Sequence, residues 1–365
     1  MQEQLPEDRY KYTVILVMLI TILFTGVNGL VAFILFVVFS RLNLGRDPIY
    51  KHGLSSGKSR LGGLAIFISI LIGCCSHLFF NSDFNLTSLL IEFDKMIIFS
   101  LSIGLIGLVE DLSQSFSSSK RLICMLIFVS VSLWFQYDLV PIDLELFNIL
   151  GLGGLFMPAY IFTVVMVSGF INAGNIADGA NGLLASIFLS FFILAYSIDS
   201  SIMNFSIVIT LLAFIIFNVF TGKIFLGDFG SYFLSSLVAF KSLEFYFNNN
   251  ASAFFLGTIL VYPCFELSRS LIIRSIKSTS VMSPDNNHFH NYVNTYILNF
   301  GISKHSANSI TGLSIAFLTT ITPICLFFSG FEIDSKIWII LFVSQFLLLS
   351  IVYFYFEKKL SETHK

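Results

Sequence analysis

Acidic and polar residues that could hold a metal or a phosphate are scattered through an otherwise apolar sequence. Glu110 and Asp111 stand side by side where an apolar run ends. Two neighbouring acids at such a boundary are costly unless a cation or a donor meets them, and adjacent carboxylates suit Mg²⁺. Asp228 lies between Gly227 and Gly230, where the backbone can approach a phosphate closely while the acid holds a metal on it. A solvated helix end is the alternative interpretation of the acidic pair.

Four polar residues recur at every third position between two apolar runs. They are Asn172, Asn175, Asp178 and Asn181. On a helical turn this spacing places side chains on roughly one face, where they could hydrogen bond a nucleotide or a sugar. The density of Asn, Asp and Gly is also typical of a simple turn, which is the alternative interpretation.

Two histidines, His288 and His290, follow Pro284 and Asp285 in a polar segment at about 275–306. Histidines two positions apart do not share a helix face, but both can meet one ligand from an extended or looped segment. A zinc pair would need a spacing of four or further His and Cys ligands, so we interpret the pair as a diphosphate-binding element. A solvated loop without function is the alternative.

The composition excludes most classes of protein that could carry these residues. Of the 365 residues, 56% are hydrophobic and only 12% are charged. A soluble globular chain carries about 25% charged residues. A soluble enzyme and a disordered protein are therefore excluded, and the net charge of −2 argues against a nucleic-acid partner. A polytopic membrane protein remains.

Apolar runs of about 20 residues predict membrane-spanning helices. We count eleven of them, at roughly 13–40, 62–80, 94–112, 121–137, 155–171, 182–198, 205–221, 231–247, 252–274, 307–329 and 336–356. The runs are continuous rather than alternating, which favours helices over barrel strands. We therefore predict an all-α polytopic membrane protein in which residues 1–365 form one integral membrane domain. Its chemistry-bearing region is roughly 40–300.

The Lys and Arg residues predict how these helices are oriented. If the N-terminus lies outside, most of the 20 Lys and Arg residues fall at inner ends of spans. An odd number of spans then places the C-terminus in the cytoplasm. The acidic, amide and histidine segments, and also Lys58–Gly63, all fall on this inner side, which favours an enzyme working at the cytoplasmic face. A secondary transporter, the alternative, would place polar residues near mid-span and show matched halves.

Taken together, these segments resemble the polyprenyl-phosphate N-acetylhexosamine-1-phosphate transferases of glycosyltransferase family 4. These are bacterial membrane enzymes that begin lipid-linked glycan assembly. Glu110–Asp111 is similar to the acidic pair of the family, and Asn172–Gly179 to its Asn-x-x-Asn-x-x-Asp-Gly loop. Gly227–Ser231 matches its Gly-Asp-x-Gly-Ser metal motif, and His288–His290 resembles its histidine loop. The histidine loop looks closest to the undecaprenyl-phosphate N-acetylglucosamine-1-phosphate transferase branch.

Three positions depart from the family pattern. Glu110 replaces the first aspartate of the usual Asp-Asp pair, Asn181 stands where an aspartate is common, and Asn291 replaces a third histidine. Glutamate retains the charge, whereas the two asparagines retain hydrogen bonding but not acid–base capacity. A catalytically lapsed homologue with a scaffold role is therefore a further alternative.

The resemblance implies the transfer of a sugar 1-phosphate, by default N-acetylglucosamine 1-phosphate, from a UDP-sugar to undecaprenyl or another polyprenyl phosphate. UMP would be released, and the product would start a cell-surface glycan. The family implies Mg²⁺ as cofactor, with Mn²⁺ as a substitute. It also implies a multi-pass protein of the bacterial inner membrane with its active site on the cytoplasmic face. Apolar spans are compatible with a homodimer.

The resemblance also implies a role for each site residue. Asp228 and Asp111 would hold the metal, and Asp111, Glu110 and Asp178 would be catalytic. Substrate contacts are expected from Asn172, Asn175, Asn181, Lys58, Arg60, Arg121, His288 and His290. Direct attack by the lipid phosphate and a covalent aspartyl intermediate both stay open.

Overall fold

The chain is helical throughout the part that the computed structural model describes. This part comprises residues 7–42, 45, 58–80, 86–144, 147, 150–276, 287–333 and 336–363. Within these residues there is no strand, and one isolated parallel bridge joins Ser59 to Ile224. The predicted all-α class is confirmed.

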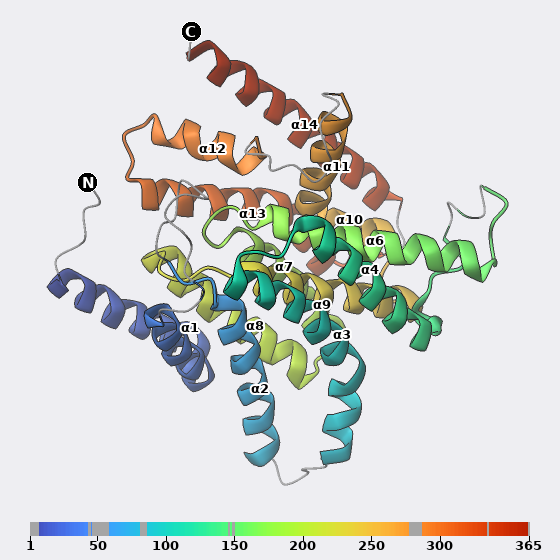
Figure 1. Ribbon diagram of the computed structural model, residues 1–365, viewed down its shortest axis with the longest axis horizontal. Helices are drawn as coiled ribbons and strands as arrows, with labels where there is room; N and C mark the ends of the chain where they lie inside the picture. Colours follow the sequence, from blue (N-terminus) through green and yellow to red (C-terminus); the bar gives the residue numbers. More distant parts are fainter. Residues whose placement is uncertain are drawn as a thin grey trace.

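Figure 1 shows how the helices are arranged. In chain order they are α1 (Glu7–Arg41), α2 (Gly62–Phe80), α3 (Leu86–Ser113), α4 (Ser118–Phe135), the 3₁₀ turn η1 (Tyr137–Leu139), α6 (Phe156–Ala177), α7 (Leu183–Ile198), α8 (Ile202–Thr221), α9 (Gly227–Phe247), α10 (Ala253–Ile259), α11 (Val261–Ile276), α12 (Phe289–Leu298), α13 (Lys304–Phe328) and α14 (Ile337–Thr363).

Several of these helices are long and apolar enough to cross a membrane. Six of the described helices meet this requirement, and a seventh span is formed if α10 and α11 are counted together. The other four predicted spans fall on α1, α2, α7 and α9. Helix α1 has non-helical backbone angles at Gly26, and α7 is only 16 residues long. The polytopic helical architecture is thus confirmed, while the count of eleven stays a prediction.

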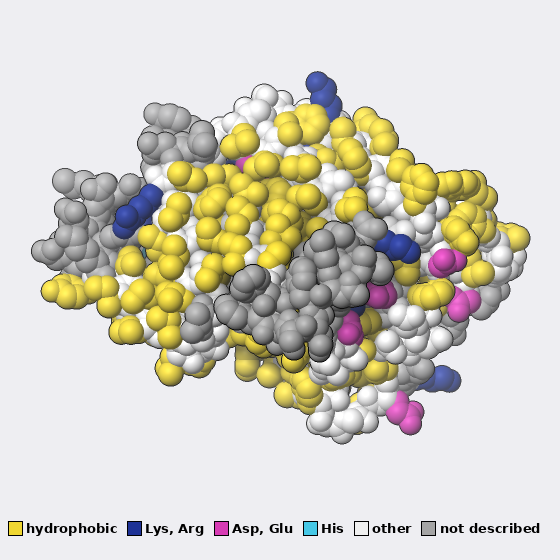
Figure 2. Space-filling view, turned by 90° about the horizontal axis from the view of Figure 1, so that it is seen from below, with side chains coloured by type: hydrophobic (Ala, Val, Ile, Leu, Met, Phe, Trp, Pro, Cys, Tyr) yellow, Lys and Arg dark blue, Asp and Glu magenta, His cyan; other side chains and the backbone are white. Residues whose placement is uncertain are grey.

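Apolar side chains cover much of the surface. Figure 2 shows one face on which hydrophobic side chains dominate and charged side chains are few. Helix α14 illustrates this, because Leu347, Leu348, Ile351 and Phe354 are each more than half exposed. Water would penalise so large an apolar surface, whereas lipid does not.

Helix α9 lies among the others and packs against α2, α3, α6 and α7 (Figure 1). Small residues permit these close approaches. A Cβ atom at Gly63 would overlap the backbone of Gly230, and one at Gly107 would overlap the backbone of Asp228. The start of α9 is therefore held tightly against the end of α3.

The pair α10–α11 is bent by 84°. Pro263 lies in the first turn of α11, where its ring cannot accommodate the carbonyl of Ile259 in a continuous helix. Figure 1 shows α11 standing nearly upright where α13 lies horizontal. The bend directs Glu266 and Arg269, both buried on α11, towards the start of α12.

Candidate active site

The end of α3 and the start of α9 meet through Asp111. Its carboxylate is fully buried and accepts hydrogen bonds from the backbone N–H groups of Asp228, at 3.0 Å, and Phe229, at 2.8 Å. The first N–H groups of a helix have no partner within the helix, and the positive end of the helix dipole favours an anion there. Asp111 therefore fixes the first turn of α9, and with it the position of Asp228.

Two arginines from other segments reach the same carboxylates. The Nη2 of Arg60 lies 3.2 Å from Oδ1 of Asp228, and its Nε lies 3.4 Å from Oδ1 of Asp111. Arg121, in the first turn of α4, donates to Oδ2 of Asp228. Arg60 is placed by the short bridge at Ser59, whose C=O accepts the N–H of Phe225 at 2.8 Å.

The end of α6 supplies the third side of the site. Asn175 Oδ1 accepts the hydroxyl proton of Ser231, on α9, at 2.7 Å, and Asn172 lies about one turn earlier on α6. Asp178 caps the C-terminus of α6. Burial and, to a smaller extent, the nearby Asp228 carboxylate raise the pKa of Asp178 to about 7. Asp111, Asp178 and Asp228 are thus brought within electrostatic reach of one another.

The histidine pair, His288 and His290, lies next to the turn that follows Asp178. The ring of His290 is buried against Gly179, where a Cβ atom would overlap the imidazole, so only glycine allows this approach. His288 and His290 stack with ring centroids 5.3 Å apart and planes at 12°. Burial lowers the pKa of His290 to about 4, so this imidazole is neutral at pH 7 and interacts through hydrogen bonds rather than charge. Pro284 and Asp285 lie outside the described residues.

Three expected site residues point elsewhere. The Glu110 carboxylate accepts the backbone N–H of Phe116 at 2.9 Å, in the connection after α3. Asn181 packs against α13, where its Nδ2 donates to Ser309 Oγ at 3.1 Å. The ammonium of Lys58 lies 5.1 Å from the centre of the Phe225 ring, and burial lowers its pKa. The structure does not bring Glu110 or Asn181 into the cluster around Asp228.

Sequence reasoning did not find that Tyr262 contacts His290, nor that Glu266 lies at the centre of the hydrogen bonds around the histidine pair. The Tyr262 hydroxyl lies 3.1 Å from both the Glu266 carboxylate and Nδ1 of His290. One signal was present, because a tyrosine four positions before a glutamate in an apolar run lies on the same helix face.

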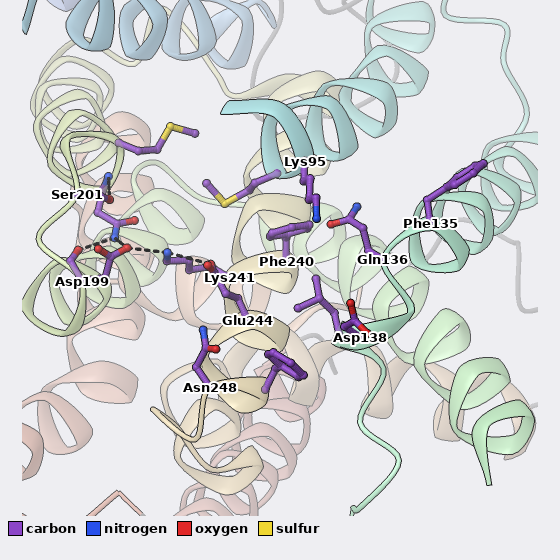
Figure 3. Close-up of a pocket in the computed structure, with 15 residues that line it drawn as sticks. Lys95, Phe135, Gln136, Asp138, Asp199, Ser201, Phe240, Lys241, Glu244 and Asn248 are labelled. Carbon is purple, nitrogen blue, oxygen red and sulfur yellow. Dashed lines mark hydrogen bonds and ion pairs between the residues drawn. The ribbon is translucent and has the colours of Figure 1, made fainter. Parts of the chain in front are cut away.

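A cavity of about 410 Å³ lies at the opposite end of α9 (Figure 3). Lys241 lies there between Asp199, at 2.8 Å, and Glu244, at 2.9 Å. Lys241, Asp199 and Glu244 therefore form a structural ion-pair cluster. Residues 228 and 241 are 13 positions apart on one helix, which is about 20 Å at 1.5 Å per residue. The cavity is therefore separate from the acidic cluster.

Comparison with known proteins gives one consistent result. Residues 95–246, from α3 into α9, match the model of glycosyl transferase family 4. The chain is 27% identical over 302 residues to a probable undecaprenyl-phosphate N-acetylglucosaminyl 1-phosphate transferase of Bacillus subtilis (strain 168), covering 80% of this chain and 77% of the relative. It is 29% identical over 233 residues to an undecaprenyl-phosphate alpha-N-acetylglucosaminyl 1-phosphate transferase of Thermotoga maritima, covering 63% and 66%.

A second kind of relative is similar at the same level. The chain is 26% identical over 296 residues to a phospho-N-acetylmuramoyl-pentapeptide-transferase of Fervidobacterium nodosum, covering 74% of this chain and 87% of the relative. Both kinds of relative transfer a phosphorylated sugar according to their names. The matched segment contains the cluster residues Asp111, Arg121, Asn175, Asp178 and Asp228.

Proposed function

We propose that the chain is a phosphosugar transferase of glycosyl transferase family 4 acting on a polyprenyl phosphate, because residues 95–246 match the model of that family and its relatives carry this activity in their names. In this proposal N-acetylglucosamine 1-phosphate passes from UDP-N-acetylglucosamine to undecaprenyl phosphate, and UMP is released. The observation that carries the proposal is the convergence of Asp111, Asp178 and Asp228 with Arg60 and Arg121 at one end of the helices.

The proposed topology has eleven spans in one integral membrane domain, with the N-terminus outside and the C-terminus in the cytoplasm. The Lys and Arg distribution supports this orientation. It directs the C-terminal ends of α3 and α6 and the start of α9 towards the cytoplasm of a bacterium, where sugar nucleotides are available. A homodimer through apolar spans stays a prediction.

The reaction joins two anions, so positive charge must surround the phosphates. A phosphate monoester has a second pKa of about 6 and is largely dianionic at neutral pH, so a strong base is not required. An oxygen of the lipid phosphate bonds to the sugar-linked phosphorus, while the bond from that phosphorus to the bridging oxygen breaks and its electrons leave with UMP. Positioning and electrostatics supply most of the rate.

We assign positioning, phosphate binding and substrate contact to different residues. Both oxygens of Asp111 accept backbone N–H groups, so we assign it to positioning Asp228 rather than to attack on phosphorus. Arg60 and Arg121 bind carboxylates that a phosphate can replace, because guanidinium matches both groups in geometry. Asn172, Asn175 and Asp178 border the site and contact the sugar nucleotide.

The oxygen donors of the site fit Mg²⁺. Among the described residues three carboxylates, Asp111, Asp178 and Asp228, face two guanidinium groups, so anionic oxygens are in excess. No group of three His, Cys, Asp or Glu within the described residues is arranged to hold a metal alone. Mg²⁺ is commonly held by one or two carboxylates with substrate phosphates and waters. Asp228, supported by Asp111, would hold the ion, which when bound neutralises charge on the diphosphate.

The test is a transfer assay with the purified full chain in detergent. The chain is incubated with undecaprenyl phosphate and, in turn, each of a panel of UDP-sugars. Mass spectrometry of the lipid product then identifies the sugar. We expect lipid-linked N-acetylglucosamine phosphate and stoichiometric UMP. Absence of lipid product from every UDP-sugar, under conditions in which the Bacillus subtilis relative is active, contradicts the proposal.

UDP-N-acetylmuramoyl-pentapeptide belongs in the same panel, because relatives of that specificity match the chain at similar identity. Product from this donor alone would replace the sugar in the proposal but retain the reaction. Uptake of a substrate into proteoliposomes without lipid product would support the transporter alternative.

A further inference from the structure

Glu266 is a fully buried carboxylate to which donors point from several directions. Its Oε1 accepts the backbone N–H of Phe289 at 2.7 Å and the hydroxyl proton of Tyr262 at 3.1 Å. Its Oε2 accepts from Nη2 of Arg269 at 3.2 Å and lies 3.0 Å from Nδ1 of His288. A buried carboxylate satisfied by this many donors is rigidly oriented, and removing it would take one acceptor away from each of these donors.

This carboxylate anchors the histidine loop from another helix. His288 is the N-cap residue of α12, but its side chain makes no capping hydrogen bond. Glu266, on α11, accepts the N–H of Phe289 instead and so performs the role of an N-cap. The bend between α10 and α11 brings Glu266 to this position. The start of α12 is therefore fixed relative to α11.

The hydrogen bonds of Tyr262 determine which nitrogen of His290 carries a proton. The Tyr262 hydroxyl lies 3.1 Å from Glu266 Oε1 and 3.1 Å from His290 Nδ1, and it has one proton to give. An ionised carboxylate can only accept, so the tyrosine donates to Glu266. Its oxygen then accepts from Nδ1–H of His290. A neutral imidazole carries a single N–H, so Nε2 of His290 keeps its lone pair.

The Nε2 of His290 faces the turn that carries Asp178. A Cβ atom at Gly179 would lie closest to this nitrogen, which places it against the backbone of Asp178–Gly179. An unprotonated Nε2 presents an acceptor at the border of the site, whereas the other tautomer would present a donor. The tautomer thus decides which kind of substrate group can be bound there.

We propose that Glu266 is a positioning residue which, through Tyr262, holds His290 with Nδ1 protonated, so that Nε2 accepts a hydrogen bond from an O–H or N–H group of the sugar nucleotide. This inference rests on the proposed function for the substrate class. Hydroxyl and amide donors are both present on an N-acetylated sugar nucleotide. The previously expected contact between His290 and the diphosphate needs a donor and does not fit this tautomer.

The first test is spectroscopic and needs no substrate. Ring nitrogens are labelled with ¹⁵N in all six histidines, and solid-state NMR of the full chain in lipid reads the tautomers. The His290 signals are assigned by their loss in His290→Gln. We expect Nδ1–H and bare Nε2 for His290 in the wild type. In Glu266→Gln and Tyr262→Phe, we expect a change to Nε2–H or to a mixture of the tautomers.

The second test is kinetic. Replacing groups that orient a ligand or a catalytic imidazole typically lowers function by about 10- to 10⁴-fold. We expect Glu266→Gln to lower kcat/KM about 10²-fold, mainly through a higher KM, because a binding contact is lost. Tyr262→Phe should lower it about 10-fold. The matched control is Glu244→Gln, which makes the same change near the C-terminal end of α9. It should leave both the kinetics and the His290 signals unchanged.

The outcomes separate the inference from the proposed function. An Nε2–H tautomer in the wild type, or an unchanged tautomer in both variants, overturns the inference. The same holds for unchanged KM and kcat in both variants. If Glu266→Gln fails to fold, Tyr262→Phe decides, because it removes only the hydroxyl. A wild type that transfers no sugar phosphate, but whose His290 tautomer depends on Glu266, would contradict the proposed function and retain the positioning role.

Discussion

Both ends of α9 carry charged side chains inside the helical bundle. The surroundings that stabilise these charges differ between the two ends. At the first end, the side chains of Asp111 and Asp228 are 0% and 8% exposed. At the second end Lys241 is 8% exposed, but its partners Asp199 and Glu244 are 44% and 37% exposed. Water can therefore hydrate the carboxylates at the second end, whereas those at the first depend on arginine and backbone donors.

This difference distinguishes a site from a structural ion pair better than the size of a cavity does. The cavity of Figure 3 adjoins Lys241, yet the side chains of Asp199 and Glu244 are partly exposed and open to hydration. The carboxylates of Asp111 and Asp228 are buried beside each other, which is unfavourable in the absence of a ligand. Groups held in such an environment cluster at functional sites. We therefore locate the chemistry at the Asp228 end of α9, away from the cavity beside Lys241.

The largest expected effect comes from Asp228→Asn. The amide keeps the size of the side chain but loses the charge that the metal and both arginines require. We expect transfer to fall at least about 10³-fold, since the residue acts on the developing charge of the reaction. The matched variant is Asp199→Asn, which removes one carboxylate at the other end and should leave the rate within about threefold.

Both variants are compared by lipid-linked product per mole of monodisperse protein in detergent. If Asp228→Asn retains the wild-type rate, the assignment of Asp228 to the metal is wrong. Equal losses in both variants would mean that the two ends do not differ in function.

Removal of divalent metal should abolish transfer in the wild type. EDTA is expected to stop product formation, and added Mg²⁺, or Mn²⁺ in its place, should restore it, because both prefer oxygen ligands. Mg²⁺ should also raise the thermal unfolding midpoint of the wild type but not of Asp228→Asn, since ligands stabilise only a state that binds them. Full activity in EDTA would remove the metal from the mechanism.

The pH dependence of stability tests whether carboxylate charge is in excess at the first end of α9. The pKa of Asp178 is about 7 in the folded chain against an ordinary value of 3.8. Between these values the folded state holds a proton that the unfolded state has lost, so raising the pH destabilises the fold. At about 1.4 kcal/mol for each pKa unit, this amounts to about 4 kcal/mol at pH 8.

The corresponding experiment uses metal-free protein. Asp178→Asn has no carboxylate to ionise, so it should be more stable than the wild type at pH 8 and similar to it near pH 4. Thermal unfolding in detergent with EDTA, at both pH values, measures the difference. A difference that is the same at both pH values would mean that Asp178 ionises freely in the folded chain.

The sequence predicted the helices and the common end of the bundle at which the acidic segments meet. It did not predict in which direction each side chain at that end points. The runs of apolar residues identify helices regardless of their partners. Glu110 and Asp111 looked equivalent in sequence. On a helix, neighbouring side chains point about 100° apart, so Asp111 reaches α9 while Glu110 binds the N–H of Phe116.

Asn181 shows a second limit of sequence reasoning. Its spacing from Asn172, Asn175 and Asp178 suggested one shared face, but α6 ends at Ala177. The chain then turns before α7, and Asn181 packs against α13. The helix end was not visible in the three-residue repeat, because the repeat continues through it. The tertiary partners of Glu266 were equally hidden, because α12 lies more than twenty residues further along the chain.

The smallest expected effect comes from Lys241→Met, which removes the buried ammonium at the second end of α9. Loss of one partner of a fully buried ion pair costs about 3–5 kcal/mol. Here the remaining carboxylates of Asp199 and Glu244 are 44% and 37% exposed and can be hydrated, so we expect a loss of only about 1 kcal/mol. Transfer should be unchanged, because Lys241 lies about 20 Å along the helix from Asp228.

Stability is measured by unfolding the detergent-solubilised chain with increasing SDS, and transfer is measured in the same preparation. Lys241→Arg serves as the control, because it retains the positive charge and should match the wild type in both measurements. If Lys241→Met folds normally but abolishes transfer, the two ends of α9 act together. In that case the cavity beside Lys241 belongs to the active site, and the contrast between hydrated and buried carboxylates does not locate the chemistry.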